Sequence, residues 1–276
     1  MKLSLIQMNS TASRDDNVAK ASALIDRAVA SERPDLVVVP EFFNTLYVFQ
    51  YWDMKYLKEA ERDDGPTITR MKEKAREHRI HVIATIFEED GPGLYYDTAI
   101  AIDPEGRIIG KYRKTHPAAV RSLEKLFFRY GSHFPVFKIG DWRVGAVICY
   151  DAAFPETARC SAINGAELIV APFAAPLRNC WREQMMVRAF ENGVFFAPCN
   201  KVGTEGNWKF GGTSMIVDPH GTVLAEASGT KEEIITASLN RDEIYRARQV
   251  RPHFRDRRPD LYAPICTPTE DIPRLD

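Results

Sequence analysis

The chain has 276 residues, of which 45% are hydrophobic and 11% aromatic, so a sizeable core is expected and disorder is excluded. A formal net charge of −1 argues against nucleic acid or an anionic membrane surface as a partner. No apolar run approaches the roughly 20 residues of a membrane-spanning helix, and residues 1–9 predict a strand rather than a signal peptide. Five cysteines without CxxC spacing fit reduced thiols in a cytoplasmic protein, with neither a disulfide framework nor a zinc site.

The first half of the chain alternates predicted strands and helices. The apolar segment 2–8 predicts a strand, and an amphipathic helix is expected at 16–31. The run 35–40 predicts a second, buried strand, and a helix is expected at 66–79. Residues 98–106 predict a strand that ends in a Pro/Gly turn, and another short apolar strand is expected after the turn. This order predicts a β-hairpin.

The second half repeats this order. A strand at 143–149 matches the opening strand, a helix is expected at 156–165, and the strand at 167–172 matches the earlier buried one. A further helix is expected at 179–192, and residues 213–221 repeat the strand and turn of the first hairpin. The alternative to a true repeat is chance resemblance among alternating strands and helices.

A true repeat would determine the fold class, which we predict to be α/β. Each half would form a mixed sheet with helices on one face, and the two bare faces would bury each other. The result is a four-layer α-β-β-α sandwich with an internal pseudo-two-fold repeat. We expect a single domain over residues 1–262 and a C-terminal tail at 263–276, which we interpret as an arm on a partner subunit of a homodimer or larger homo-oligomer.

The segment 143–156 is the most informative for function. Its hydrophobic strand ends on Cys149, the chain then turns, and Pro155 and Glu156 open a helix. Active sites of α/β proteins collect at the carboxyl ends of strands, and a helix N-terminus favours the reactive thiolate. For a cysteine considered alone, an inert buried thiol is the alternative.

Three charged residues lie at other strand ends or in apolar surroundings. Glu41 follows a buried strand and precedes two phenylalanines, so its carboxylate is expected to be desolvated and to act as a base. Lys114 follows the first hairpin, and strand alternation directs it inward, whereas Lys111 and Arg113 are expected on a solvated face. Glu124 lies in a loop rich in bulky apolar residues. Each acid has a solvent-exposed alternative when it is considered alone.

The combination resembles the carbon–nitrogen hydrolase (nitrilase) superfamily, which hydrolyses nitriles, amides and N-carbamoyl compounds, and the likeness spans nearly the whole chain. Three stretches look like the glutamate, lysine and cysteine motifs of that family: Pro40-Glu41-Phe42-Phe43, Tyr112-Arg113-Lys114-Thr115-His116, and Cys149-Tyr150-Asp151 with Phe154-Pro155-Glu156. Three further matches lie outside the catalytic positions, at 188–192, 200–203 and 257–262. The family fold is an α-β-β-α sandwich, which agrees with the repeat.

The resemblance implies a mechanism without a metal or other cofactor. Glu41 takes the proton of Cys149, and the thiolate attacks an amide or carbamoyl carbon. Lys114 and the backbone N–H of Tyr150 face the oxygen that becomes negative. Ammonia then leaves after protonation by Glu41, and water hydrolyses the thioester.

The resemblance also assigns residues around the substrate. Glu124 matches a second family glutamate that orients the substrate and the lysine, and we assign Tyr150 and Phe173 to substrate binding. The sequence around Glu124 looks most like the N-carbamoyl amine and N-carbamoyl amino-acid amidohydrolases. We therefore predict a cysteine-dependent amidohydrolase that releases ammonia from a small amide or N-carbamoyl compound.

One departure from the family bears on the substrate. Relatives that act on N-carbamoyl-D-amino acids carry two arginines where this chain has Ala152 and Ala153, so the clamp for a substrate carboxylate is missing at that place. Two alanines suit a neutral or bulky group, with Arg178 or Arg182 as an alternative anion site.

Other activities remain open at this point. A nitrilase is the alternative within the family, although nitrilases more often show Cys-Trp-Glu than the Cys-Tyr-Asp found here. A non-catalytic or thiol-sensing protein with the same fold is an alternative of another class. A thiol acyltransferase would share the first half-reaction.

Overall fold

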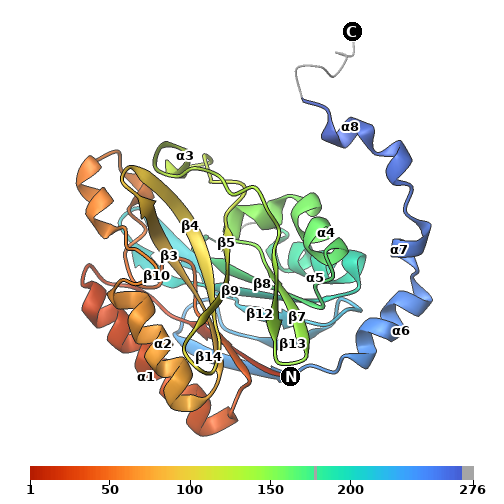
Figure 1. The fold of residues 1–276 in the computed structure, drawn as a ribbon, viewed down its shortest axis with the longest axis horizontal. Helices are drawn as coiled ribbons and strands as arrows, with labels where there is room; N and C mark the ends of the chain where they lie inside the picture. The colour runs from red at the N-terminus through yellow and green to blue at the C-terminus, as the bar shows by residue number, and fades with distance from the viewer. Residues whose placement is uncertain (177–178, 269–276) are drawn as a thin grey trace.

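The computed structural model describes residues 1–176 and 179–268 (Figure 1). Within these residues, two six-stranded sheets pack against each other, and helices cover the outer face of each sheet. The mixed α/β architecture and the four layers confirm the predicted fold class. Arg178 and residues 269–276 of the predicted tail lie outside the described residues.

The first sheet has the strand order β14-β1-β2-β3-β4-β5. Strands β1, β2 and β3 run parallel, whereas β4, β5 and β14 are antiparallel to their neighbours. The bounds are β1 Lys2–Gln7, β2 Leu36–Val38, β3 His81–Gly91, β4 Leu94–Ile102, β5 Ile108–Arg113 and β14 Glu233–Ser238. Helices α1 (Arg14–Glu32) and α2 (Pro66–His78) pack on its outer face.

The second sheet has the strand order β13-β12-β9-β8-β7-β6. Its bounds are β6 Val136–Ile139, β7 Trp142–Ala146, β8 Leu168–Phe173, β9 Phe195–Asn200, β12 Met215–Val217 and β13 Val223–Glu226. Helices α4 (Pro155–Ile163) and α5 (Trp181–Asn192) cover its outer face. The remaining elements are the hairpin of β10 (Val202–Glu205) and β11 (Trp208–Gly211), helices α3 (Glu124–Phe127), α6 (Asp242–Val250), α7 (His253–Asp256) and α8 (Ala263–Cys266), and 3₁₀ turns at Val48–Gln50, Met54–Glu59, Cys149–Ala153 and Pro259–Leu261.

The repeat is visible in the strand order. Strands β1-β2-β3-β4-β5 of the first sheet correspond in order to β7-β8-β9-β12-β13 of the second. Each sheet gains one antiparallel strand at the first strand of its repeat, β14 beside β1 and β6 beside β7. The second half also inserts the β10–β11 hairpin between β9 and β12, which the sequence pattern did not predict.

Strand alternation explains why four layers form. In the apolar run of β2, Leu36 and Val38 face the second sheet, whereas Val37 packs against α1 and α2. In β8, Leu168 faces the first sheet and Ile169 packs against α4 and α5. Because successive side chains point to opposite faces, a strand that is apolar at every position must be covered on both sides.

After β14 of the first sheet the chain continues into three helices, and the first of them, α6, packs on the core through Ile244. In Figure 1, α7 and α8 follow α6 as an extended arm (residues 251–268), with α8 away from both sheets. Large apolar side chains are exposed at the end of α6 and along the arm, among them Val250, Leu261 and Ile265. None of the helices in the described parts of the chain is both long and apolar enough to span a bilayer.

Candidate active site

The predicted site residues come from strand ends on both sheets. Glu41 lies just beyond β2, Lys114 directly follows β5, and Cys149 lies beyond β7 at the start of a 3₁₀ turn. Glu124 is the first residue of the short helix α3. Glu41, Lys114 and Glu124 are buried, whereas Cys149 is partly accessible. The structure therefore brings the three charged residues into the interior, as expected for Lys114 from strand alternation.

The ammonium of Lys114 is the centre of this charged cluster. Its Nζ lies 2.7 Å from Glu41 Oε1, 2.7 Å from Glu124 Oε2 and 3.1 Å from Asp97 Oδ2. Burial alone would lower the pKa of Lys114, but the surrounding carboxylates outweigh it and raise the pKa well above its ordinary value. Lys114 is therefore positively charged at any physiological pH.

The two oxygens of Glu41 have different partners. Oε1 accepts a hydrogen bond from Lys114, and Oε2 accepts one from the backbone N–H of Ala174 at 2.6 Å. Ala174 directly follows β8 of the other sheet, so the carboxylate bridges the two halves of the molecule. The next residue, Phe42, has a φ of 49°, a left-handed conformation that costs a residue other than glycine of order 1–3 kcal/mol.

Glu124 is held by three donors. Its Oε2 accepts from Lys114 and from the backbone N–H of Ala118 at 2.8 Å, and its Oε1 accepts from the hydroxyl of Tyr47 at 2.6 Å. Burial raises the pKa of Glu124 despite the attraction of Lys114. A cluster of aromatic side chains packs around this region and includes Phe42, Tyr47, Phe49, Phe87, Phe127 and Phe128.

The turn that carries Cys149 is fastened through Asp151. The Asp151 carboxylate accepts hydrogen bonds from the N–H of Ile148 at 3.0 Å, the N–H of His116 at 2.9 Å and the hydroxyl of Tyr112 at 2.6 Å. Burial opposes ionisation of Asp151, but hydrogen bonds to the His116 ring, the Tyr112 hydroxyl and the Ile148 N–H outweigh it and lower the pKa of Asp151. Asp151 therefore joins the segment around Lys114 to the turn that carries Cys149.

The other side of the turn is held by a helix. Arg188 of α5 is buried and donates to the carbonyl oxygens of Ala152 at 3.0 Å and Ala153 at 3.2 Å. Cys149 itself has a φ of 46°. Such a conformation persists only where the surroundings fix it, and here contacts from both sheets and from α5 do so.

The prediction that a helix N-terminus favours the thiolate is wrong. Helix α4 begins only at Pro155, beyond the 3₁₀ turn of Cys149. Desolvation and the Glu41 carboxylate raise the pKa of Cys149 well above its ordinary value, and Lys114 only partly opposes them. At neutral pH the resting thiol therefore keeps its proton and requires a base to become a nucleophile.

Cys149 opens into a small cavity of about 30 Å³. The predicted substrate-binding residues Tyr150 and Phe173 both line it. The full lining is Cys149, Tyr150, Ala152, Ala153, Phe173, Ala175, Trp181 and Gln184. None of these side chains is charged. The indole N–H of Trp181 is buried and has no hydrogen-bond partner among the described residues.

The sequence did not reveal the partners of Lys111 and Arg113 or the place of Asp97. Lys111 and Arg113 are partly exposed, and both also pair with the buried carboxylate of Glu88, at 2.7 and 2.8 Å. Asp97 was missed, although a carboxylate next to the apolar strand residues from Thr98 onward is an unusual signal. Burial raises the pKa of Asp97 well above its ordinary value, and the charges of the two glutamates add to this shift against the attraction of Lys114.

Arg182, the described alternative for an anion site, lies on the surface. Its guanidinium is exposed and pairs with Glu226 at 3.0 Å rather than lining the cavity.

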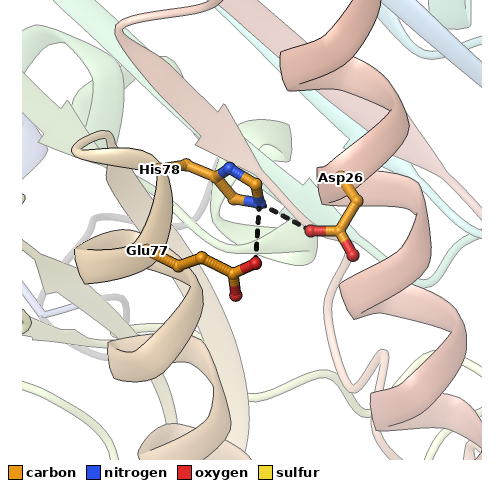
Figure 2. Close-up of side chains that lie close together, drawn as sticks. All are labelled: Asp26, Glu77 and His78. Carbon is orange, nitrogen blue, oxygen red and sulfur yellow. Dashed lines mark hydrogen bonds and ion pairs between the residues drawn. The ribbon is translucent and has the colours of Figure 1, made fainter.

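Two groups of side chains in the described residues have the spacing of metal ligands. One is Glu41, Asp97 and Glu124, and the other is Asp26, Glu77 and His78 between α1 and α2 (Figure 2). A lysine ammonium already lies within each group, Lys114 in the first and Lys74 in the second, where Lys74 Nζ lies 2.7 Å from Asp26 Oδ1 and 2.9 Å from Glu77 Oε2. An ammonium at that distance fills the place that a cation would take.

A family model described as carbon-nitrogen hydrolase matches residues 2–249. The chain belongs to the carbon–nitrogen hydrolase family. Its relatives include a protein named nitrilase from Pyrococcus abyssi, 36% identical over 95% of this chain and 99% of the relative. A 2-oxoglutaramate amidase from Bacillus subtilis is 34% identical over 90% and 93% of the two chains. An N-carbamoylputrescine amidase from Arabidopsis thaliana is 34% identical over 91% and 90%.

Solved structures agree with this membership. A carbon-nitrogen hydrolase from Helicobacter pylori G27 matches this hydrolase with a TM-score of 0.92 and 27% identity, over 97% of this chain and 98% of that one. An amidase variant from Nesterenkonia sp. AN1 matches with a TM-score of 0.82 and 25% identity, over 96% and 99%. That structure contains acrylamide added at the active-site cysteine of the amidase. This hydrolase therefore acts on carbon–nitrogen bonds other than peptide bonds.

Proposed function

We propose that this hydrolase cleaves a small, uncharged primary amide or N-carbamoyl compound through a thioester on Cys149 and releases ammonia. The observation that carries the proposal is the buried Lys114 ammonium between Glu41 and Glu124, at the same strand edge as the cavity that Cys149 lines. A neutral thiol beside a buried carboxylate and a permanently charged ammonium is suited to general-base attack on a carbonyl carbon.

In the first half-reaction, Glu41 accepts the thiol proton while Cys149 Sγ forms a bond to the substrate carbonyl carbon. The carbonyl oxygen becomes negative and is stabilised by the charge of Lys114 and by the N–H of Tyr150, which is at the start of a 3₁₀ turn where the first N–H groups have no partner within the turn. Each such donor typically contributes roughly 3–4 kcal/mol to the transition state. Glu41 then passes its proton to the nitrogen, and the C–N bond breaks to release ammonia.

In the second half-reaction, Glu41 accepts a proton from water, whose oxygen attacks the thioester carbon. The C–S bond breaks, and Cys149 recovers its proton from Glu41. Glu124 accepts a hydrogen bond from Lys114 and is in turn fixed by Tyr47. We propose Glu124 as a positioning residue for the ammonium and for the substrate.

The cavity supports an uncharged substrate. Among the described residues, the side chains that line the cavity are all neutral and offer no opposite charge to a carboxylate or ammonium on the substrate, and an unpaired buried charge is costly. The unpartnered N–H of Trp181 and the amide of Gln184 instead suit a neutral oxygen on the substrate. We therefore propose that amides with neutral acyl groups are preferred over N-carbamoyl amino acids.

Nitrile hydrolysis to acid and ammonia is a second candidate, supported by the 36% identity to a protein named nitrilase. Both activities would use Cys149 as the nucleophile, but attack on a nitrile gives a thioimidate, which must add a water molecule before ammonia can leave and the thioester forms. A nitrile with the same acyl skeleton as the best amide separates them.

The test measures ammonia release from a panel of neutral amides, N-carbamoyl amines, N-carbamoyl amino acids and nitriles. We expect kcat/KM for the best neutral amide to exceed that for a carboxylate-bearing analogue by tenfold or more, which corresponds to about 1.4 kcal/mol. Cys149→Ala, assayed alongside, should release none. Unchanged activity in this variant, or a preference for N-carbamoyl amino acids, would contradict the proposal.

We also propose that the C-terminal arm (251–268) packs on a second copy of the chain. Leu261 and Ile265 are 61% and 65% exposed. If the arm did not pack on another chain, these apolar side chains would stay in contact with water. Analytical ultracentrifugation should give a dimer or larger oligomer, and Leu261→Asp with Ile265→Asp should lower the mass. A monomeric wild-type protein would exclude this arrangement.

A further inference from the structure

A second fully buried lysine lies near the site, and the mechanism above does not use it. Lys201 follows β9, and Glu205 ends the next strand, β10. Lys201 Nζ lies 2.7 Å from Glu205 Oε1, and both side chains are inaccessible to solvent. Replacing a buried ion pair with apolar residues is often neutral or stabilising, so stability alone does not account for this pair.

The ammonium of Lys201 holds the backbone next to Glu41. Its Nζ donates to the carbonyl oxygens of Phe42 at 3.3 Å and Thr45 at 3.0 Å. Phe42 is the residue with the left-handed conformation, so Lys201 contacts the peptide whose geometry directs the Glu41 carboxylate. Losing this contact would let the strained residue relax and Glu41 move.

The carboxylate of Glu205 reaches the other glutamate. Glu205 Oε2 accepts a hydrogen bond from the backbone N–H of Tyr47 at 2.6 Å. The hydroxyl of Tyr47 donates to Glu124 Oε1, also at 2.6 Å. One ion pair therefore contacts both ends of the segment 41–47 that carries Glu41 and supports Glu124.

We propose that Lys201 and Glu205 form a positioning pair that sets the places of Glu41 and Glu124 around Lys114. The inference rests on the proposed function, in which those carboxylates act on the substrate. A displacement near 1 Å in such a site can cost on the order of 10²-fold in rate. The pair would thus affect kcat without touching the substrate.

The main test compares wild type with the double variant Lys201→Met/Glu205→Gln, which removes both charges and leaves no buried ion unpaired. The glutamine side chain introduced by Glu205→Gln keeps an oxygen that can accept the Tyr47 N–H. We expect a folded protein by circular dichroism, a kcat on the neutral amide lowered by about 10- to 100-fold, and a KM within about threefold of wild type. A wild-type kcat in the folded double variant would overturn the inference.

A second readout does not depend on the substrate. The Glu41 charge raises the pKa of Cys149, so a displaced Glu41 should shift the pH midpoint of Cys149 alkylation by iodoacetamide downward. Peptide mass spectrometry separates Cys149 from the exposed Cys180 and Cys266. If wild type hydrolyses nothing in the panel, the proposed function fails, and an unshifted midpoint would overturn the positioning role separately.

The control is Lys74→Met/Asp26→Asn, which removes a lysine–carboxylate pair between α1 and α2 on the outer face of the first sheet; Figure 2 shows the Asp26 partner of this pair. This control is expected to change the melting temperature but neither kcat nor the alkylation midpoint. If Lys201→Met/Glu205→Gln does not fold, Glu205→Gln alone, which keeps the Lys201 contacts, is expected to lower kcat by a few-fold, and an unchanged kcat would overturn the inference.

Discussion

Lys114 and Lys201 are both fully buried, yet their pKa values move in opposite directions. Lys201 faces a single carboxylate, and burial outweighs the attraction of Glu205 and lowers its pKa. Lys114 faces three carboxylates, which outweigh burial and raise its pKa. The number of acids around a buried amine therefore decides the direction in which its pKa shifts.

The two clusters also differ in what they contact. Lys114 and its glutamates lie at the strand edge that also carries Cys149, whereas Lys201 and Glu205 contact backbone groups of the segment 41–47. Tyr47 connects them, because its N–H binds one cluster and its hydroxyl binds the other. In the proposed function, the first cluster acts on the substrate, and the second cluster positions the glutamates of the first.

The largest expected effect follows from Lys114→Met. Removing the ammonium deprives the developing oxyanion of its positive charge, and we expect kcat to fall by about 10³-fold. Steady-state kinetics on the best neutral amide measure this. The control is Lys111→Met, a half-buried lysine of β5 that pairs with Glu88, for which a change within about threefold is expected. Equal decreases of kcat in the two variants would contradict a specific role for Lys114 in stabilising the oxyanion.

A smaller effect tests the raised pKa of Asp97. Because the pKa of Asp97 is raised in the folded protein, the folded state holds a proton that the unfolded state releases above its pKa of about 3.9. Stability from this group is therefore lost as pH rises from about 4. Relative to wild type, Asp97→Asn should become progressively more stable between pH 4 and 7, by at least about 1 kcal/mol in urea unfolding. The opposite trend would mean that Asp97 is an ionised partner of Lys114.

The smallest effect is expected from Tyr47→Phe, which removes the hydroxyl that links Glu124 to the second cluster. The N–H bond to Glu205 remains, so the segment keeps its position. We expect a loss of about 1 kcal/mol in stability and a few-fold decrease in kcat. A loss of kcat as large as that of Lys114→Met would show that Tyr47 itself takes part in the chemistry.

Much of the fold follows from local pattern. The runs 35–40 and 167–172 are apolar at nearly every position, which predicts strands that are covered on both faces. The strand orders β1-β2-β3-β4-β5 and β7-β8-β9-β12-β13 agree with the repeat. The β10–β11 hairpin escaped prediction because it is an insertion that has no counterpart in the first half of the repeat.

The positions of site residues that follow buried strands could be predicted from sequence. Burial and pKa shifts that depend on contacts between distant residues could not. Glu41 and Lys114 were placed inward from their strand positions alone. The ordinary charge of Lys111 suggested a solvated face, because nothing local reveals that Glu88 is buried opposite it. Likewise, the state of the Cys149 thiol depends on burial and on Glu41, which lies far away in the sequence.

The most direct test of the account is acid quenching during turnover of butyramide, followed by peptide mass spectrometry. The account predicts a butyryl group on Cys149 while ammonia is being released, and none on the buried Cys199 or in Cys149→Ala. Full ammonia release by wild type with Cys149 unmodified at every quench time would indicate direct attack by water and contradict the thioester.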